Sequence, residues 1–487
     1  MTLSYTSVDE LRMKLPASKK NLIFIGCLFM MLSLAAFGLS LSTIQQPLLN
    51  EMGQPVMFSL VTVLTSIAMC LMTPVGGRIS DMIGGRQVIL IFGMLTLVLS
   101  IVLGFCTSFI PFVIVRILCA MATGAFVSTP FLLVREIYEN NQVPSRMGIL
   151  TAALSAGSLI GSFGAGFFAD HQMMFLAIVF PSIFLMIGIP LIYMNLPKLP
   201  THSSKFDFLG FLLLSAALTT LFLALNYAGQ LTFHNPLIWA GIISGIVFFV
   251  LFIFVEKKKE TPLINMDLFS NKLFSLVLLI AFLSFCYLIA MNAYAPLAVQ
   301  ELMNGTAAES GSLQIPRAII TILLPGLVGT WVVKKQGRMW QALAIASILI
   351  FIPFLGMVFI GPNMPVWFVM VLLALNGIGD CFRSVSITPA AQAQLRPDQL
   401  GIGTSLLSFA TSLASVFASS VYGLVYDGLS QATPGLQGQI EGLDTVFLIA
   451  AGTGLISFLL VVSVYRPWIN KQREEQEKAH VEASAAK

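Results

Sequence analysis

The sequence predicts an all-α integral membrane protein with fourteen transmembrane helices, arranged as two six-helix bundles and an inserted helix pair. Three observations predict it: the composition, the length of the apolar runs and an internal repeat. Of the 487 residues, 57% are hydrophobic and only 10% are charged, and the mean hydropathy is +0.90. Soluble domains carry about 25% charged residues. Most of the surface of this chain must therefore face lipid.

Fourteen apolar runs are long enough to cross a bilayer, which takes about 20 residues in a helix. They are too long and too evenly apolar to be the strands of a membrane barrel. An even number of spans places both termini on one side of the membrane. The runs cover 21–44, 56–76, 87–107, 110–133, 147–168, 173–195, 207–228, 236–255, 273–296, 311–333, 339–360, 364–386, 400–424 and 444–465.

Lysine and arginine predict the orientation, because basic residues are retained on the cytoplasmic side of a membrane. With the N-terminus inside, every basic residue except Arg116 and Arg317 lies in a tail, a cytoplasmic loop or the cytoplasmic end of a span. The outer side is expected to hold acids, among them Asp170, Asp427 and Asp444. We therefore expect a multi-pass protein of the cytoplasmic membrane with both termini in the cytoplasm.

An internal repeat divides the chain into two halves. Residues 77–86 (GRISDMIGGR) leave a span for an inner loop, and 329–338 (GTWVVKKQGR) do the same at an offset of 252 residues, 329 minus 77. Two parallel repeats are typical of transporters whose substrate site lies near the midplane between the halves. The predicted organisation is a tail (1–20), a six-helix bundle (21–196), an inserted pair (197–260), a second bundle (261–466) and a tail (467–487).

The segment 77–86 resembles the signature loop of the major facilitator superfamily, G-x-L-a-D-r-x-G-r-k. Glycines permit a tight turn between close-packed helices. The resemblance implies a conformational switch in which the aspartate latches one half against the other, and the second copy of the repeat has Val333 at that position. The candidate switch residues are Gly77, Asp81, Gly84 and Arg86.

Other features are similar to the fourteen-helix drug:proton antiporter branch of that superfamily. The fifth span resembles the branch signature g-x-x-x-G-P-x-x-G-G, and we expect its Gly157, Gly161 and Gly166 to let helices pack closely. The resemblance implies a bacterial plasma-membrane protein that exports amphipathic small molecules, as multidrug efflux proteins do, in exchange for protons. The first span lacks the acid that many members place there, so cations are not the expected substrates.

Charged groups inside spans are costly, by about 2.5 kcal/mol or more at a helix centre, and so indicate function. Asp380 is the only acid well inside a predicted span, and we expect it to carry the proton next to Arg383; a permanent ion pair of the two is the alternative. Arg116 and Arg317 are expected to contact an anionic substrate or a proton relay, or else to extend to the membrane surface. Further cavity candidates, each of which could instead bond helices together, are Gln45, Gln46, Tyr287, Asn292, Tyr294 and Asn376.

Several functional classes find no support in the sequence. It has no GxxxxGK[ST] loop for ATP, no histidine or cysteine spacing typical of a metal site, and no long basic run for nucleic acid. We expect no enzymatic activity, no cofactor and no metal, and a monomer in the bilayer that the proton gradient drives. The membrane arginines favour an anionic or neutral substrate, and an organic-anion uniporter, symporter or antiporter of narrow range is the alternative function.

Overall fold

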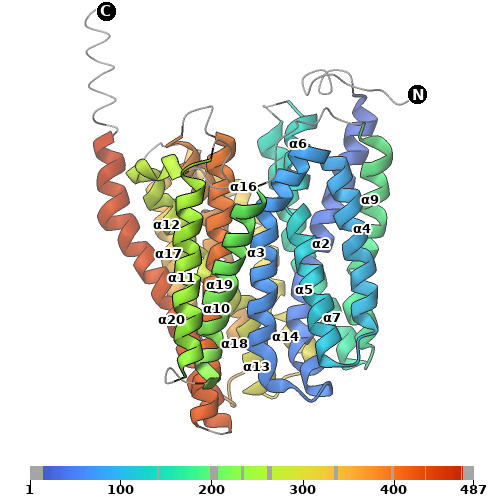
Figure 1. The fold of residues 1–487 in the computed structure, drawn as a ribbon, viewed down its shortest axis with the longest axis vertical. Coiled ribbons are helices and arrows are strands. Elements are labelled where there is room, and N and C mark those ends of the chain that lie inside the picture. Colours follow the sequence, from blue (N-terminus) through green and yellow to red (C-terminus); the bar gives the residue numbers. More distant parts are fainter. Residues whose placement is uncertain are drawn as a thin grey trace, which may run out of the picture.

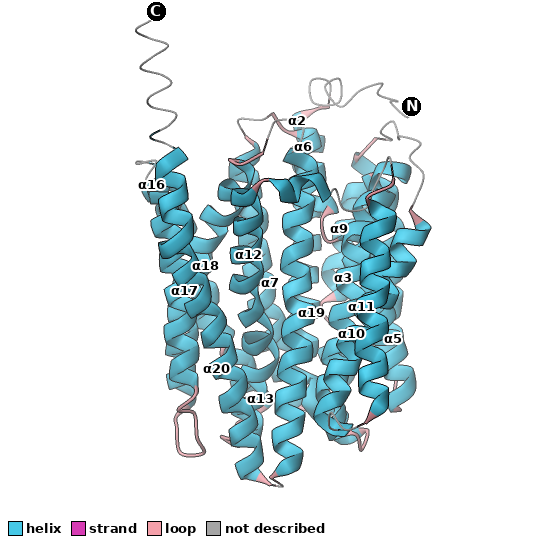
Figure 2. Ribbon diagram, turned by 60° about the vertical axis from the view of Figure 1, so that its left-hand side comes forward, coloured by secondary structure: helices cyan, strands magenta, loops and turns pink. Residues whose placement is uncertain are grey.

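The structure, a computed structural model, describes residues 15–139, 142–197, 207–231, 235–259, 266–333, 338–395, 400–433, 435–472 and 474. Over these ranges the chain is helical and contains no strand (Figure 2). Thirteen helices are long and apolar enough to cross a membrane, and one bent pair supplies a fourteenth span. The predicted fold class is therefore confirmed.

The first six spans form one bundle around the long helix α2, which packs along α7 and α9. The helices α3 and α4 pack against α5 in the same bundle. The elements are α2 (Ala17–Glu51), η1 (Pro55–Met57), α3 (Phe58–Ile83), α4 (Gly85–Gly104), α5 (Phe109–Phe126), α6 (Thr129–Ile137), α7 (Val143–Asp170), α8 (Met174–Val179) and α9 (Ser182–Asn195).

The last six spans form the second bundle, in which α12 packs on α19 and α20, and α18 on α15 and α17. Two spans contain a π-helical turn, η3 and η5. The elements are η2 (Met266–Ser270), α12 (Lys272–Ile289), η3 (Ala290–Tyr294), α13 (Ala295–Glu301), α14 (Ala307–Ser312), α15 (Gln314–Leu323), α16 (Pro325–Val333), α17 (Arg338–Met357), α18 (Val366–Gln392), α19 (Leu400–Ala432), α20 (Leu436–Leu460) and η5 (Val461–Tyr465).

The inserted pair, α10 (Phe208–Leu231) and α11 (Pro236–Glu256), covers the seam between the bundles. The two helices pack on each other, and α10 also contacts α3 of the first bundle and α19 of the second. Asp207 begins α10 by accepting hydrogen bonds from Gly210 N (2.7 Å) and from Lys259 Nζ. Burial raises the pKa of Asp207, but these donors outweigh it and hold the pKa below its usual value.

Three spans differ from their predicted form. The span predicted as continuous over 311–333 begins at Ala307 and bends by 43° before Pro325, because proline has no N–H for the helical hydrogen bond. The last two long helices also extend further than predicted. Asp427 and Asp444 consequently lie within α19 and α20, and Asp427 is buried.

The two ends of the molecule are distinguished by the termini (Figure 1). Helix α2 begins, and η5 ends, at the upper end of that view, which we call the termini end. The helices α13 and α14 lie toward the opposite, far end. All spans run between these two ends, as expected for a multi-pass membrane protein.

Candidate substrate and proton site

Asp380 lies near the middle of α18 and binds groups from two other helices. Its Oδ1 accepts hydrogen bonds from Arg383 Nη2 (2.6 Å) and from the Tyr287 hydroxyl of α12. Its Oδ2 accepts from Arg317 of α15, through Nε at 3.0 Å and also through Nη2. These four residues form what we call the Asp380 cluster, and its carboxylate is only 7% exposed. The carboxylate is thus held by two cations and one hydroxyl.

The surroundings of the cluster explain how two arginines fit beside one acid. Gly377 precedes Asp380 by one turn, and a Cβ there would lie 3.0 Å from Arg317 Cγ, so a glycine lets α15 approach α18. The Arg383 guanidinium lies 3.9 Å from the centre of the Phe285 ring and donates to Ser284 O at 3.3 Å. A cation over an aromatic face is stabilised by the ring quadrupole. The sequence does not predict the contacts of Ser284 and Phe285 with Arg383, because those two residues lie on a different span, α12.

Arg116, on α5, forms no ion pair with an acid in the part of the chain that the structure describes. It is 9% exposed, and its Nη2 donates to Gln45 Oε1 of α2 at 3.4 Å, while its Nε has no hydrogen-bond partner among the described residues. Gln45 Nε2 in turn donates to Phe58 O and Thr62 Oγ1 of α3, both at 2.9 Å. This guanidinium is therefore positioned by a neutral amide, and the hydrogen bonds it makes do not use all its donors.

The charges of these groups do not balance. Arg317 and Arg383 share the one carboxylate of Asp380, and Arg116 bonds a neutral amide, so these four groups together carry a formal charge of +2, three minus one. Exposed fractions of about a tenth in each arginine show that water reaches them little. Buried charge without an equal countercharge is unfavourable, so a buried excess of this kind favours the binding of an anion.

The other predicted cavity residues lie elsewhere. Gln46 donates to Asn50 Oδ1 at 3.3 Å and lines a hollow of about 250 Å³ at the far end. The Tyr294 ring packs edge-on against Phe58, with 5.8 Å between ring centres. Asn376 donates to Leu349 O of α17 at 3.3 Å, and Asn292 is half-buried in η3. The structure therefore brings together only Tyr287, Arg317, Asp380 and Arg383, with Arg116 and Gln45 as a second group.

The seam between the bundles is closed at the far end. Gln300 Nε2 donates to Thr43 O at 3.0 Å, and Ser59 Oγ of α3 donates to Asp427 Oδ1 of α19 at 2.7 Å. Asp170 of α7 accepts 3.0 Å hydrogen bonds from the backbone N–H groups of Ala307 and Ala308 on α14. Composition and spacing alone do not indicate that Asp170 and Asp427 join the two halves, because they predict only that both acids lie on the outer side of the membrane.

Glycines near the two ends of the molecule differ in what an added Cβ would meet. At the far end, a Cβ on Gly166 or Gly311 would collide with a backbone carbonyl of the opposite half. Toward the termini end, a Cβ on Gly77 of α3, Gly148 of α7 or Gly326 of α16 would meet no atom within 4 Å. The two halves are thus in backbone contact at the far end, whereas the three glycines toward the termini end have open space where a Cβ would stand.

The candidate switch loop is a single-residue turn. Helix α3 continues to Ile83, and Gly84 joins it to α4 with φ +87°, a conformation that favours glycine. Arg86 lies 4.2 Å from the centre of the Tyr193 ring of α9. The side chain of Asp81 is outside the part of the chain that the structure describes.

The glycines of α7 lie where helices touch. A Cβ on Gly157 or Gly161 would collide with the backbone carbonyl of Leu32 or Ala36 on α2, and Gly166 approaches Ala307 of α14 in the same way. Small residues at four-residue spacing allow this close approach. Gly157 and Gly161 share the face of α7 that packs on α2, whereas Gly166, five residues later, lies on another face and contacts α14 of the second bundle.

Comparison with known proteins agrees with this architecture. The chain is 23% identical over 430 residues to Multidrug resistance protein 3 of Bacillus subtilis, covering 85% of this chain and 82% of that protein. It is 22% identical over 431 residues to the multidrug transporter protein MdtP of the same organism, covering 85% and 76%. The crystal structure of the human organic anion transporter MFSD10 shares the fold, with a TM-score of 0.61, 18% identity, and coverage of 92% of this chain and 100% of that one. The family model of the Major Facilitator Superfamily matches residues 23–419 and 279–486. This chain therefore belongs to the Major Facilitator Superfamily and is a transporter, not an enzyme.

Proposed function

We propose that this transporter moves amphipathic small molecules that are anionic at neutral pH, and that Asp380 couples their movement to protons. The observation that carries the proposal is the excess of three buried arginines, Arg116, Arg317 and Arg383, over Asp380, the one described carboxylate in an ion pair with any of them. A cationic substrate would require a carboxylate partner, and the acid of the cluster is already bound by two arginines. The abundant methionine and phenylalanine, 23 and 38 residues, supply apolar contact for the rest of such a molecule.

For alternating access, the seam between the two halves must be open at one end while it is closed at the other. Since the basic residues predict a cytoplasmic termini end, the hydrogen bonds at the far end close the described state to the outside. Opening the far end requires the bonds of Thr43, Ser59 and Asp170 to the second half to break. Asp81 then latches the halves at the cytoplasmic end in the opposite state. No cofactor takes part, and one chain suffices.

The Asp380 cluster determines whether the substrate and the proton move in the same direction or in opposite directions. An anion that binds Arg317 or Arg383 competes with Asp380 for the same N–H donors. A carboxylate that loses these donors in a buried site binds a proton more readily. The anion and the proton therefore favour each other, and they cross together. One proton with one monovalent anion carries no net charge, so such transport is insensitive to the membrane potential.

Proton-driven export of amphipathic compounds is the second candidate function. It is supported by the relatives named multidrug resistance protein and multidrug transporter. In that case substrate and proton move in opposite directions and must compete for the carrier. The two candidates thus differ in the direction in which a pH gradient drives the substrate.

Proteoliposomes that contain the purified chain test both candidates. An aromatic carboxylate and a lipophilic quaternary ammonium serve as substrates, with a pH gradient of either sign and, separately, a potassium diffusion potential. We expect an acidic exterior to drive uptake of the carboxylate, with little effect of the potential. Extrusion of substrate toward the acidic side would favour the second candidate. Transport of the quaternary ammonium alone would contradict the proposed anion preference.

A further inference from the structure

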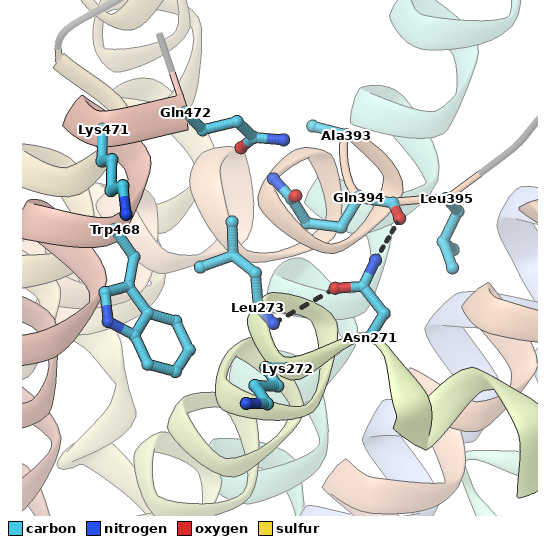
Figure 3. Close-up of a pocket in the computed structure, with 9 residues that line it drawn as sticks. All are labelled: Asn271, Lys272, Leu273, Ala393, Gln394, Leu395, Trp468, Lys471 and Gln472. Atoms are coloured by element: carbon cyan, nitrogen blue, oxygen red, sulfur yellow. Dashed lines mark hydrogen bonds between the residues drawn. The ribbon is translucent and has the colours of Figure 1, made fainter. Parts of the chain in front are cut away.

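A hollow of about 570 Å³ lies at the termini end of the second bundle, away from the Asp380 cluster. It is enclosed by the start of α12, the end of α18 and the helical residues that follow η5 (Figure 3). Neither the transport site nor the seam uses it. The residues that line it are Asn271, Lys272, Leu273, Ala393, Gln394, Leu395, Trp468, Lys471 and Gln472.

The hollow exists because the last helix separates from its neighbours. In Figure 1 α20 and η5 lean away from the bundle as they approach the termini end. The π-helical turn η5, which ends two residues before Pro467, interrupts the regular helix there, and both features are known causes of helix bending. The direction is maintained by Arg466, whose guanidinium lies 4.6 Å from the centre of the Trp340 ring on α17.

The opposite wall of the hollow, formed by the start of α12 and the end of α18, is held together by hydrogen bonds. Asn271 accepts hydrogen bonds from the N–H groups of Leu273 (3.1 Å) and Phe274 (3.2 Å) and so caps α12. Its Nδ2 donates to Gln394 O at 2.8 Å, which ties the start of α12 to the end of α18 (Figure 3). The hollow is thus bordered by a hydrogen-bonded corner on one side, which carries Lys272, and by the last helix, which carries Lys471, on the other.

The lining combines two chemistries. Lys272 and Lys471 supply two positive charges, and none of the described residues that line the hollow is an acid. Leu273, Leu395 and the indole of Trp468, which is 42% exposed, supply an apolar surface beside them. Tryptophan at a helix end is typical of the depth at which lipid headgroups lie. A soluble anion would use the amines but leave the exposed indole without a partner.

We propose that this hollow binds the headgroup of an anionic phospholipid, with its phosphodiester between Lys272 and Lys471 and its glycerol and upper acyl chain against Trp468. Basic pockets between transmembrane helices on the cytoplasmic side recognise such headgroups. The bound lipid bridges the last helix to the α12–α18 corner, so it fills the gap that the π-turn creates. This inference does not depend on the transported substrate.

Binding to the full-length protein in a neutral detergent tests the proposal. Phosphatidylglycerol, phosphatidylcholine and inorganic phosphate are titrated separately, and bound lipid is counted by native mass spectrometry. Each lysine near an anionic headgroup contributes about fivefold in affinity, so the double variant Lys272→Gln/Lys471→Gln should bind phosphatidylglycerol about 25-fold more weakly. The matched control Lys257→Gln/Lys258→Gln changes two exposed lysines of the same end that lie outside the hollow and should bind as the unaltered chain does.

A second readout keeps the test valid if the lysine variant folds poorly. Phosphatidylglycerol brominated on its upper acyl chain should quench tryptophan fluorescence in the unaltered chain, and Trp468→Phe should remove most of the saturable part of the quenching. Equal weakening in the control variant would show general surface attraction and overturn the proposal. So would displacement of phosphatidylglycerol by millimolar inorganic phosphate, or equal binding of phosphatidylcholine.

Discussion

The two halves of this transporter differ in the partners of their buried arginines. In the first half, Arg116 has a neutral partner, Gln45, and an Nε without a hydrogen bond among the described residues. In the second half, Arg317 and Arg383 share the carboxylate of Asp380. A guanidinium without a countercharge is ready to bind an anion, whereas a paired one must first release its acid. The comparison assigns substrate affinity to the first half and proton coupling to the second.

Asp380→Asn is expected to have the largest effect. It leaves two buried arginines with no carboxylate, and loss of one member of a buried ion pair costs about 3–5 kcal/mol. We expect the free energy of unfolding in detergent to fall by that amount and transport to lose its dependence on the pH gradient.

The control for this variant is Glu51→Gln, which removes an exposed acid and should change neither quantity. Combining Asp380→Asn with Arg317→Gln restores part of the charge balance, so the double variant should recover at least about 1 kcal/mol relative to the sum of the two single changes. If flux through Asp380→Asn stays fully proton-dependent, Asp380 is not the coupling group.

Arg116→Gln is expected to weaken substrate binding without unfolding the protein. Hydrogen bonds to charged groups contribute about 1.5–3 kcal/mol, so the KM for an anionic substrate should rise roughly 10- to 150-fold. Thermal unfolding should change little, because Arg116 makes no ion pair with a described residue. Arg116→Lys keeps the charge and should retain part of the affinity; a KM unchanged in both variants would remove Arg116 from the substrate site.

Tyr287→Phe separates the contribution of the hydroxyl to the Asp380 cluster from that of the two arginines. It removes one donor to Asp380 and leaves both arginines in place, so we expect a loss of about 1 kcal/mol and a change in transport rate of about fivefold or less. The measurement is the rate of carboxylate uptake over a range of pH. An effect as large as that of Asp380→Asn would mean that the hydroxyl itself relays the proton.

Gln45→Leu should have the smallest effect. The variant removes the neutral partner of Arg116 but neither its charge nor its helix, so affinity should fall by about fivefold or less. Uptake assays at several substrate concentrations separate KM from maximal rate, and only KM should change. Loss of maximal rate with KM unaltered would instead place Gln45 in the conformational change.

The two ion pairs of Asp380 differ in how far the sequence predicts them. Arg383 follows Asp380 by three residues, so helical geometry alone placed them together. Arg317 precedes Asp380 by 63 residues, and its bond to that acid depends on how α15 packs against Gly377 of α18. Residues that a helix repeat does not connect are paired only by packing between helices.

The sequence by itself determined the membrane-spanning helices, their number, the repeat and the presence of costly charges within spans, because each follows from composition and from local periodicity. Only the tertiary structure decided which of those charges meet, that Asp427 and Asp170 join the halves, and that the seam is closed at one end. Those properties depend on contacts between distant segments, where a single glycine or proline sets how closely and at what angle two helices meet.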